Sequence, residues 1–142
     1  MRGDQEIVVV VRRDGELLAM RRAPERLGYW SLVSGGVEPD ETPQEAARRE
    51  LLEETGLRAE VRSLPVSLSY SLLDDPPSIR ARYAPGIERV TVHAFVADAD
   101  PGWEPTLDAE HDVYRWCDLD AAVELMAYET ARDALRAGAN AS

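Results

Sequence analysis

The chain has 142 residues, of which 44% are apolar and 30% are charged. This composition is typical of a soluble globular protein and excludes a disordered or fibrous chain. The length suits one domain spanning residues 1–142. The formal net charge of −11 argues against duplex nucleic acid or anionic membrane as a partner, because both attract clustered Lys and Arg. Solubility alone explains the acidity equally well.

The cysteine content and the N-terminal sequence bear on the cellular compartment. Cys117 is the single cysteine, so an internal disulfide is excluded and we expect a buried, inert thiol. The apolar run 7–11 is too short for a signal peptide or a membrane span. We therefore expect a cytoplasmic protein.

The first third of the chain predicts strands. Residues 6–12 are continuous, apolar and β-branched, which indicates a buried strand. Asp14-Gly15 then predicts a turn, and residues 16–21 the returning strand of a hairpin. After a polar loop, residues 29–33 form an aromatic and apolar segment, which we expect Ser34-Gly35-Gly36 to interrupt.

The rest of the chain mixes strands with helices. Strands are expected over residues 61–71, 89–97 and 113–117, and a loop or long hairpin tip over 74–86. His93 lies on the second of these strands and is expected to be structural. Asp118 is a candidate N-cap for a closing amphipathic helix over 119–137. Because strands and helices do not alternate regularly, we expect an α/β or α+β domain with a mixed β-sheet and helices on its faces.

Helix-boundary signals are most complete around residues 42–55. Thr42 suits the N-cap, Pro43 the first helical position, and Glu45 completes a capping box with Thr42. Gly56 suits the left-handed residue just past the end. These signals predict a helix of about three and a half turns at 3.6 residues a turn.

This helix carries three acidic residues at positions i, i+3 and i+4, namely Glu50, Glu53 and Glu54. At about 100° per residue they fall on one face, where like charges repel each other. A divalent cation would compensate this repulsion, and oxygen ligands select hard ions such as Mg²⁺, which commonly also binds substrate phosphates. The alternative is a solvated acidic face. Ala46 on the same arc leaves room for ions. An adjoining apolar stripe, formed by Ala47 and Leu51, can anchor the helix to the sheet.

The residues around this helix match a known signature in every specified position. The pattern Gly-x5-Glu-x7-Arg-Glu-U-x-Glu-Glu-x-Gly-U, where U is a bulky aliphatic residue, is that of the Nudix hydrolases. Its specified positions are Gly35, Glu41, Arg49, Glu50, Leu51, Glu53, Glu54, Gly56 and Leu57. The sequence therefore resembles this family, and the resemblance implies an α/β/α sandwich that hydrolyses a nucleoside diphosphate linked to a moiety X.

The resemblance also implies roles for individual residues. Glu50 and Glu54 would bind Mg²⁺, for which Mn²⁺ can substitute, and Glu53 would be a ligand or would support one. Arg49 would orient the carboxylates. Two further positions would serve the motif's structure, Glu41 and Gly56. The backbone of Gly35-Gly36 at the helix entry would offer carbonyl and N–H groups to metal and phosphate.

Segments outside the signature resemble the subgroup of this family that acts on dihydroneopterin triphosphate and dATP. These are residues 30–35, 80–86, and 110–111 with 114–116. By that resemblance Glu110 would be a further metal ligand or the general base, since a loop carboxylate can approach the attacking water from outside the helix; the alternative is a surface carboxylate. His111 would support Glu110. Substrate contacts are expected at Arg21, Ser34, Arg82 and Tyr83, the arginines being otherwise surface groups and the tyrosine otherwise packed in its loop.

Three functions compete on these observations. The first is hydrolysis of a nucleotide-like triphosphate to a monophosphate and pyrophosphate. The second is the same chemistry on a diadenosine polyphosphate, a nucleotide sugar or an oxidised nucleotide. The third is a nucleotide-sensing regulatory module, which would not need all three helix glutamates. Homodimers are frequent in the family. The closing helix carries an apolar stripe that is either a dimer interface or part of the core, formed by Val123, Met126 and Tyr128.

Overall fold

The computed structural model describes residues 2–142. Its centre is an eight-stranded mixed sheet with the order β3-β2-β1-β7-β5, in which β4 also pairs with β1, β6 with β7 and β8 with β2. The strands are β1 (Gln5–Arg13), β2 (Glu16–Arg22), β3 (Trp30–Ser31), β4 (Val33–Gly36), β5 (Arg62–Ser63), β6 (Leu68–Ser71), β7 (Arg89–Asp98) and β8 (His111–Cys117).

Strand β1 is the central strand of this sheet. It runs parallel to β7 and antiparallel to both β4 and β2, and it uses different stretches of its length for the two antiparallel partners. Residues 7–11 are buried because helices cover both faces of the sheet. Burial on both faces explains why the sequence of this strand is continuously apolar instead of alternating.

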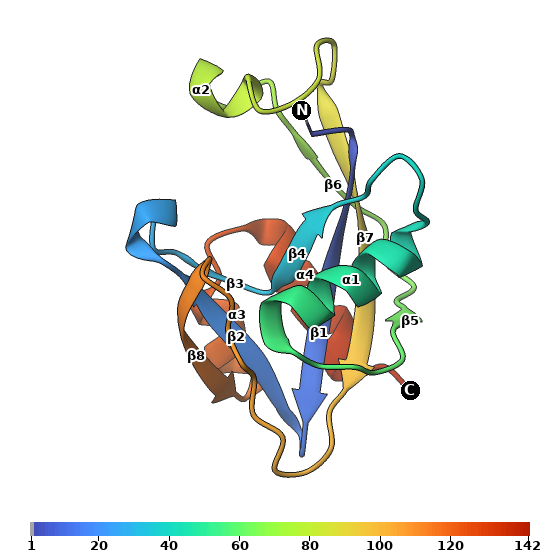
Figure 1. Cartoon of the computed structure of the whole chain (residues 1–142), viewed down its shortest axis with the longest axis vertical. Helices are drawn as coiled ribbons and strands as arrows, with labels where there is room; N and C mark the ends of the chain where they lie inside the picture. The colour runs from blue at the N-terminus through green and yellow to red at the C-terminus, as the bar shows by residue number, and fades with distance from the viewer. Residues whose placement is uncertain (1) are drawn as a thin grey trace.

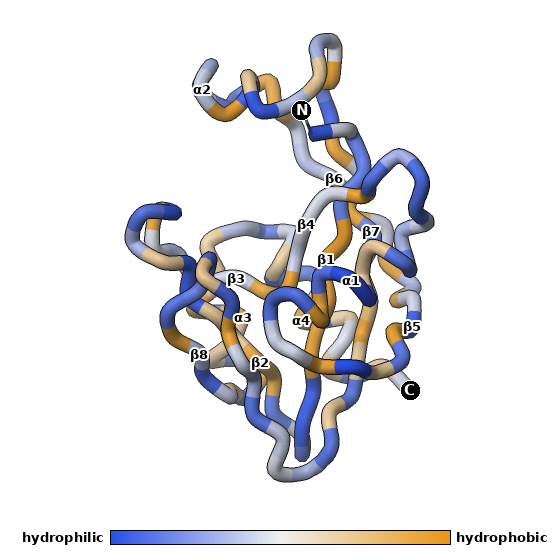
Figure 2. Tube along the Cα trace, in the orientation of Figure 1, coloured by the Kyte–Doolittle hydropathy of each residue, from blue (hydrophilic) through white to orange (hydrophobic). Residues whose placement is uncertain are grey.

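Helices cover the sheet on two sides (Figure 1). Helix α1 (Pro43–Thr55) lies in front of it in this view, and α3 (Leu119–Leu125) and α4 (Glu129–Ala139) lie behind it. Buried residues form one cluster between the sheet and α1 and another between the sheet and the two C-terminal helices. Figure 2 shows hydrophobic residues along β1 and its neighbours and hydrophilic residues in the loops. The expected α/β/α sandwich with a mixed sheet is confirmed.

Two short helical segments project from this sandwich. The 3-10 helix η1 (Pro24–Arg26) follows β2, and α2 (Pro77–Arg80) lies in the excursion between β6 and β7, near the N-terminus (Figure 1). The predicted loop over 74–86 therefore contains one short helix. Among residues 2–142, no helix is long and apolar enough to cross a membrane.

Three predicted boundaries differ from the structure. Ser34-Gly35-Gly36 does not interrupt the strand segment but belongs to β4, where pairing with residues 6–8 of β1 holds it extended. The strand expected over 61–71 is two strands, β5 and β6, separated around Pro65. The closing helix over 119–137 is two helices, because Met126 is extended (φ −68°, ψ 133°) and bridges to Trp30.

Two residues predicted to be structural are packed into the sheet. Cys117 is buried as expected, and burial raises the pKa of its thiol, which agrees with an inert cysteine. His93 lies half-buried on β7 with its Nε2 2.6 Å from Oε1 of Gln5, which agrees with a structural role.

Candidate active site

Helix α1 begins and ends where its sequence predicts. The Thr42 hydroxyl accepts a hydrogen bond from the Glu45 backbone N–H (3.1 Å), and the Thr42 backbone N–H donates to the Glu45 carboxylate (2.8 Å). At the other end Gly56 has a φ of 79°, and its N–H donates to the Leu52 carbonyl. The capping box and the left-handed glycine fix the helix on both sides.

The three helix glutamates range from the core to solvent. The side chain of Glu54 is 3% exposed, that of Glu50 14% and that of Glu53 55%. One carboxylate is therefore deeply buried, the second lies at the edge of the core, and the third faces solvent. Ala46, expected to leave room for ions, is instead fully buried against the sheet with the predicted apolar stripe.

Arg49 joins the loop before the helix to the helix itself. Its guanidinium donates two hydrogen bonds to the Glu41 carboxylate (2.6 and 3.1 Å), one to Glu50 (2.7 Å) and one to the Gly36 carbonyl (3.1 Å). The Arg49 hydrogen bonds lower the pKa of Glu41, and Glu41 in turn raises the pKa of Arg49. Such bidentate pairs are geometrically specific. The arrangement agrees with the expected roles of Arg49 in orienting Glu50 and of Glu41 in stabilising the loop–helix unit.

Gly35 gives Glu50 its place beside the sheet. A Cβ atom on Gly35 would lie 2.8 Å from Cγ of Glu50 and closer still to its carboxyl group, whereas one on Gly36 would meet nothing within 4 Å. Glycine is therefore required at position 35 for a close approach between β4 and α1.

Glu54 is a buried acid whose Oε1 atom has no hydrogen-bond partner. Burial raises the pKa of its carboxyl group well above the ordinary value, and the adjacent carboxylates of Glu50 and Asp108 raise it further. The Ser34 backbone N–H acts in the opposite direction. A buried carboxylate next to another carboxylate is a costly arrangement in a protein without a bound cation.

A histidine and an aspartate outside the signature complete this region. His111 is buried at the start of β8, its Nδ1 lies 2.8 Å from Oδ1 of Asp108, and its Nε2 lies 3.7 Å from Oε1 of Glu54. From the sequence, His111 was expected to support Glu110, and Asp108 was not among the candidate site residues. The one local signal was an acidic residue three positions before a histidine.

Glu110 does not join the helix glutamates in this structure. Its carboxylate lies 3.2 Å from Arg26 in η1, and its backbone carbonyl accepts a hydrogen bond from the Ala23 N–H. Its expected role as a metal ligand or general base requires the carboxylate to leave Arg26.

The expected substrate contacts lie in different surroundings. Arg21 is paired with Asp112 through two hydrogen bonds of 3.0 and 2.9 Å. Ser34 lies in β4 beside Gly35. Arg82 is exposed in the excursion between β6 and β7, close enough to Tyr128 to lower the pKa of that tyrosine, which burial raises overall.

Tyr83 is packed inside its loop. It is 6% exposed, and its hydroxyl lies 2.8 Å from that of Tyr70 and 3.2 Å from Oε2 of Glu6. The structure therefore agrees with the loop-packing alternative, and its ring is not free to stack on a substrate in this conformation.

The residues present fit a hard divalent cation, although the site is not assembled as a complete metal shell. Within residues 2–142, no three His, Cys, Asp or Glu side chains converge closely enough to hold a metal ion. The adjacent Glu50 and Glu54 nevertheless offer carboxylate oxygens, and Oε1 of Glu54 is buried without a partner. Oxygen donors of this kind suit Mg²⁺, which keeps several waters and takes one or two carboxylates.

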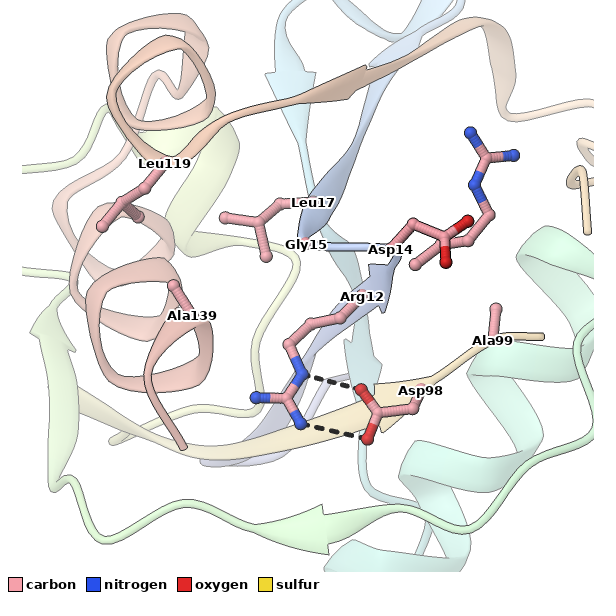
Figure 3. Close-up of a pocket in the computed structure, with 9 residues that line it drawn as sticks. Arg12, Asp14, Gly15, Leu17, Asp98, Ala99, Leu119 and Ala139 are labelled. Carbon is pink, nitrogen blue, oxygen red and sulfur yellow. Dashed lines mark hydrogen bonds and ion pairs between the residues drawn. The ribbon is translucent and has the colours of Figure 1, made fainter. Parts of the chain in front are cut away.

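A separate hollow lies at the other end of β1 (Figure 3). There Arg12 and Asp98 point toward each other and form two hydrogen bonds of 2.7 and 3.0 Å. Gly35 pairs with Ile7, near the beginning of β1, whereas this hollow is at the end of the strand. Arg12 and Asp98 of the hollow are paired with each other, and the signature glutamates lie in the region of α1 and β4 instead.

Comparison with known proteins identifies the class of protein. The profile of the family described as "NUDIX domain" matches residues 1–137. The solved structure of dihydroneopterin triphosphate pyrophosphohydrolase from Escherichia coli superposes with a TM-score of 0.80 at 27% identity, covering 94% of this chain and 92% of that one. The chain belongs to the NUDIX domain family. The prediction of a Nudix hydrolase is confirmed at the level of family and class of enzyme.

Sequence relatives within the family differ in activity and in length. Dihydroneopterin triphosphate diphosphatase of Escherichia coli K12 is 30% identical over 124 residues, covering 84% of this chain and 80% of that protein. An RNA pyrophosphohydrolase of Cereibacter sphaeroides is 30% identical over 125 residues, covering 82% and 75%. Octanoyltransferase of Myxococcus xanthus is 34% identical over 133 residues. The matched region covers 92% of this chain but only 34% of the length of that relative.

Proposed function

We propose that this protein is a Mg²⁺-dependent pyrophosphohydrolase that converts a nucleotide-like triphosphate to a monophosphate and pyrophosphate. Dihydroneopterin triphosphate and dATP are the first candidate substrates. The observation that carries the proposal is the pair Glu50 and Glu54, held side by side between α1 and β4 with one carboxylate oxygen buried and unpartnered. The similarity to dihydroneopterin triphosphate diphosphatases supports the choice of substrate.

Each residue of the site has a defined part in this proposal. Glu50 and Glu54 would hold Mg²⁺, with Glu53 as a further ligand or as the group that takes a proton from the attacking water. When bound, the cation would neutralise phosphate charge and lower the pKa of a bound water. Arg49 keeps Glu50 in place through its hydrogen bond of 2.7 Å. The backbone of Gly35 would have to give up its pairing with Ile7 in the sheet before it could face metal and phosphate.

Glu110 remains the second candidate for the general base. Its pairing with Arg26 leaves it 38% exposed at the edge of a loop, from which it could turn toward a bound substrate. Proton transfer needs the base within hydrogen-bond reach of the water, and in proteins without substrate such contacts are often longer. The pH dependence of kcat in Glu53→Gln and Glu110→Gln discriminates the two candidates. A general base makes kcat rise with pH as it loses its proton, so the base is the residue whose replacement removes that rise.

The substrate contacts are proposed at Arg21, Ser34 and Arg82. Arg21 would have to exchange Asp112 for a phosphate, and Arg82 is already exposed. Tyr83 is proposed to act on substrate binding through the loop that it stabilises, since its ring is buried.

A panel of triphosphates tests the proposal. The protein is incubated with Mg²⁺ and each of dihydroneopterin triphosphate, the deoxynucleoside triphosphates and a 5′-triphosphorylated RNA, and pyrophosphate and orthophosphate are measured separately. We expect pyrophosphate with the highest kcat/KM on a free triphosphate. Orthophosphate alone, or no turnover of any triphosphate, would remove the proposal.

The same panel addresses the competing activities. Preference for RNA ends would match the RNA pyrophosphohydrolase relatives and would correct the expectation of no nucleic acid partner. Preference for diadenosine polyphosphates, nucleotide sugars or oxidised nucleotides would keep the chemistry and change X. Tight nucleotide binding without turnover would indicate the regulatory module.

Assembly and compartment complete the proposal. We propose that residues 1–142 act as one domain in the cytoplasm, away from any membrane. We further propose that two copies of the chain form a homodimer. Met126 is core, so the exposed part of the stripe considered for dimerisation centres on Tyr128, which is 56% exposed. Sedimentation velocity distinguishes monomer from dimer.

A further inference from the structure

Two buried polar atoms face each other without a hydrogen-bond partner. Oε1 of Glu54 and Nε2 of His111 are 3.7 Å apart, and their side chains are 3% and 0% exposed. Leaving a polar atom buried and unpaired costs about 1–3 kcal/mol. Two such atoms directed at each other therefore indicate that the pair has a purpose beyond packing.

The ring of His111 is oriented by the neighbouring loop. Its other nitrogen, Nδ1, lies 2.8 Å from Oδ1 of Asp108, and since a carboxylate oxygen accepts, Nδ1 donates. This contact points Nε2 at Glu54, 3.7 Å away, and Nε2 supports the Glu54 carboxylate when it too carries a hydrogen and donates it. Carboxylates that bind a metal are commonly held in turn by hydrogen bonds from a surrounding layer of side chains.

The loop that carries Asp108 is attached to the end of α1. The Thr106 backbone N–H donates to the Thr55 carbonyl (2.9 Å), next to Glu54. Two residues earlier, Glu104 accepts hydrogen bonds from Tyr114 (2.7 Å) and from Arg13. Because the loop is fixed on both sides, His111 has little freedom to move away from Glu54.

We propose that His111, oriented by Asp108, is a positioning residue that holds the Glu54 carboxylate at the angle needed for the cation. The inference rests on the proposed function and deepens it by adding a support that lies outside the Nudix signature. Because the His111 side chain is 0% exposed, the proposal gives it no contact with the substrate or the reacting atoms. It supports Glu54 from the side of the core, as Arg49 supports Glu50 from the side of the loop.

The test compares His111→Gln and Asp108→Asn with a matched control. His93→Gln replaces the other histidine of the sequence, which contacts Gln5 on β1 instead of the helix glutamates. Three quantities are measured for each variant: the Mn²⁺ dissociation constant by calorimetry without substrate, kcat and KM on the best triphosphate, and the Tm of the metal-free protein.

A positioning role predicts a specific combination of results. His111→Gln should weaken Mn²⁺ binding and lower kcat by about 10- to 100-fold, the usual cost of losing such a support, with KM nearly unchanged. Asp108→Asn should move the same two quantities in the same direction by less, because the ring stays in place. His93→Gln should leave both unchanged.

Other results would overturn the proposal. Wild-type Mn²⁺ affinity and kcat in folded His111→Gln and Asp108→Asn would reduce the pair to core packing, even if the Tm falls. If His111→Gln does not fold, Asp108→Asn decides alone, since Asp108 is 25% exposed and tolerates an isosteric change. Failure of the wild-type protein to bind Mn²⁺ would instead reject the proposed function, and the positioning role with it.

Discussion

Glu50 lies in the narrow space between β4 and α1, bounded by Gly35 on the strand and by Arg49 on its own helix. Arg49 holds the carboxylate at 2.7 Å, and the strand offers no side chain to displace it. The position of this one carboxylate therefore depends on a missing Cβ atom as much as on a hydrogen bond.

Gly35→Ala should strongly lower activity while the protein still folds. The added Cβ would lie 2.8 Å from Cγ of Glu50, so the glutamate side chain must move out of its place. We expect kcat to fall by about 100-fold or more, which is typical when a preorganised charged group is lost from a site. Gly36→Ala is the matched control, because its Cβ meets nothing within 4 Å. Equal activity of the two variants would show that the Gly35–Glu50 approach is irrelevant to turnover.

Arg49→Lys should lower activity although the charge is kept. An ammonium group cannot reproduce the two parallel hydrogen bonds to Glu41 together with the one to Glu50. We expect a fall in kcat of about tenfold or more and a lower Tm, because breaking a partly buried pair leaves Glu41 without its partner. Arg48→Lys serves as the control, since the Arg48 side chain is 48% exposed and its ion pair with Glu60 is long, at 3.7 Å. Steady-state kinetics that do not separate the two variants would argue against this role of Arg49.

At the scale of elements, helix α1 shows what local sequence can specify. Its capping box, its proline and its terminal glycine lie within the helix or next to it, so the predicted bounds hold. The break in the C-terminal helix has no such local signal. Met126 is extended because it bridges to Trp30 and because its carbonyl accepts from Arg132, and the partner Trp30 is remote in sequence.

The end of the C-terminal helix is attached to the sheet by Arg12. Its guanidinium donates to the carbonyls of Gly138 (3.0 Å) and Ala141 (2.7 Å) and pairs with Asp98 on β7. Nearby, Gly138 lets the helix approach β1, since a Cβ there would lie 2.8 Å from Cβ of Val10. The contacts connect β1, β7 and α4 at one point.

Asp98 should give the protein a stability that depends on pH. The hydrogen bond from Arg12, assisted by Arg62, lowers the pKa of its carboxyl group in the folded state. A lowered folded pKa stabilises the protein above the unfolded pKa of about 3.9, and the contribution is lost as pH falls through the folded pKa. Asp98→Asn should therefore lower the free energy of unfolding at pH 7 by less than about 1 kcal/mol, because the carboxylate is 47% exposed and screened. The difference from wild type, measured by urea unfolding, should shrink toward pH 3; a difference that is constant with pH would contradict the assignment.

At the scale of the whole molecule, the signature specified the glutamate helix and the family, but not the surroundings of each carboxylate. The spacing of Glu50, Glu53 and Glu54 indicates a shared face, whereas their graded burial depends on how α1 lies on the sheet. The contact between Glu54 and His111 joins residues 57 positions apart, and local patterns carry no information about such a pair. For the same reason the burial of Tyr83, which contacts the remote Glu6 as well as Tyr70, could not be read from the local sequence.

The most direct measurement is the rate of pyrophosphate release from the best triphosphate by wild type, Glu54→Gln and Glu53→Gln, with and without Mg²⁺. Wild type should release pyrophosphate only when Mg²⁺ is present, and both variants should lose about 100-fold or more in kcat. Their metal-free Tm should stay close to that of wild type, because glutamine has nearly the same shape and, at Glu54, removes a buried charge. Turnover like that of wild type in both variants, or pyrophosphate release without a divalent cation, would contradict a function built on the glutamate helix.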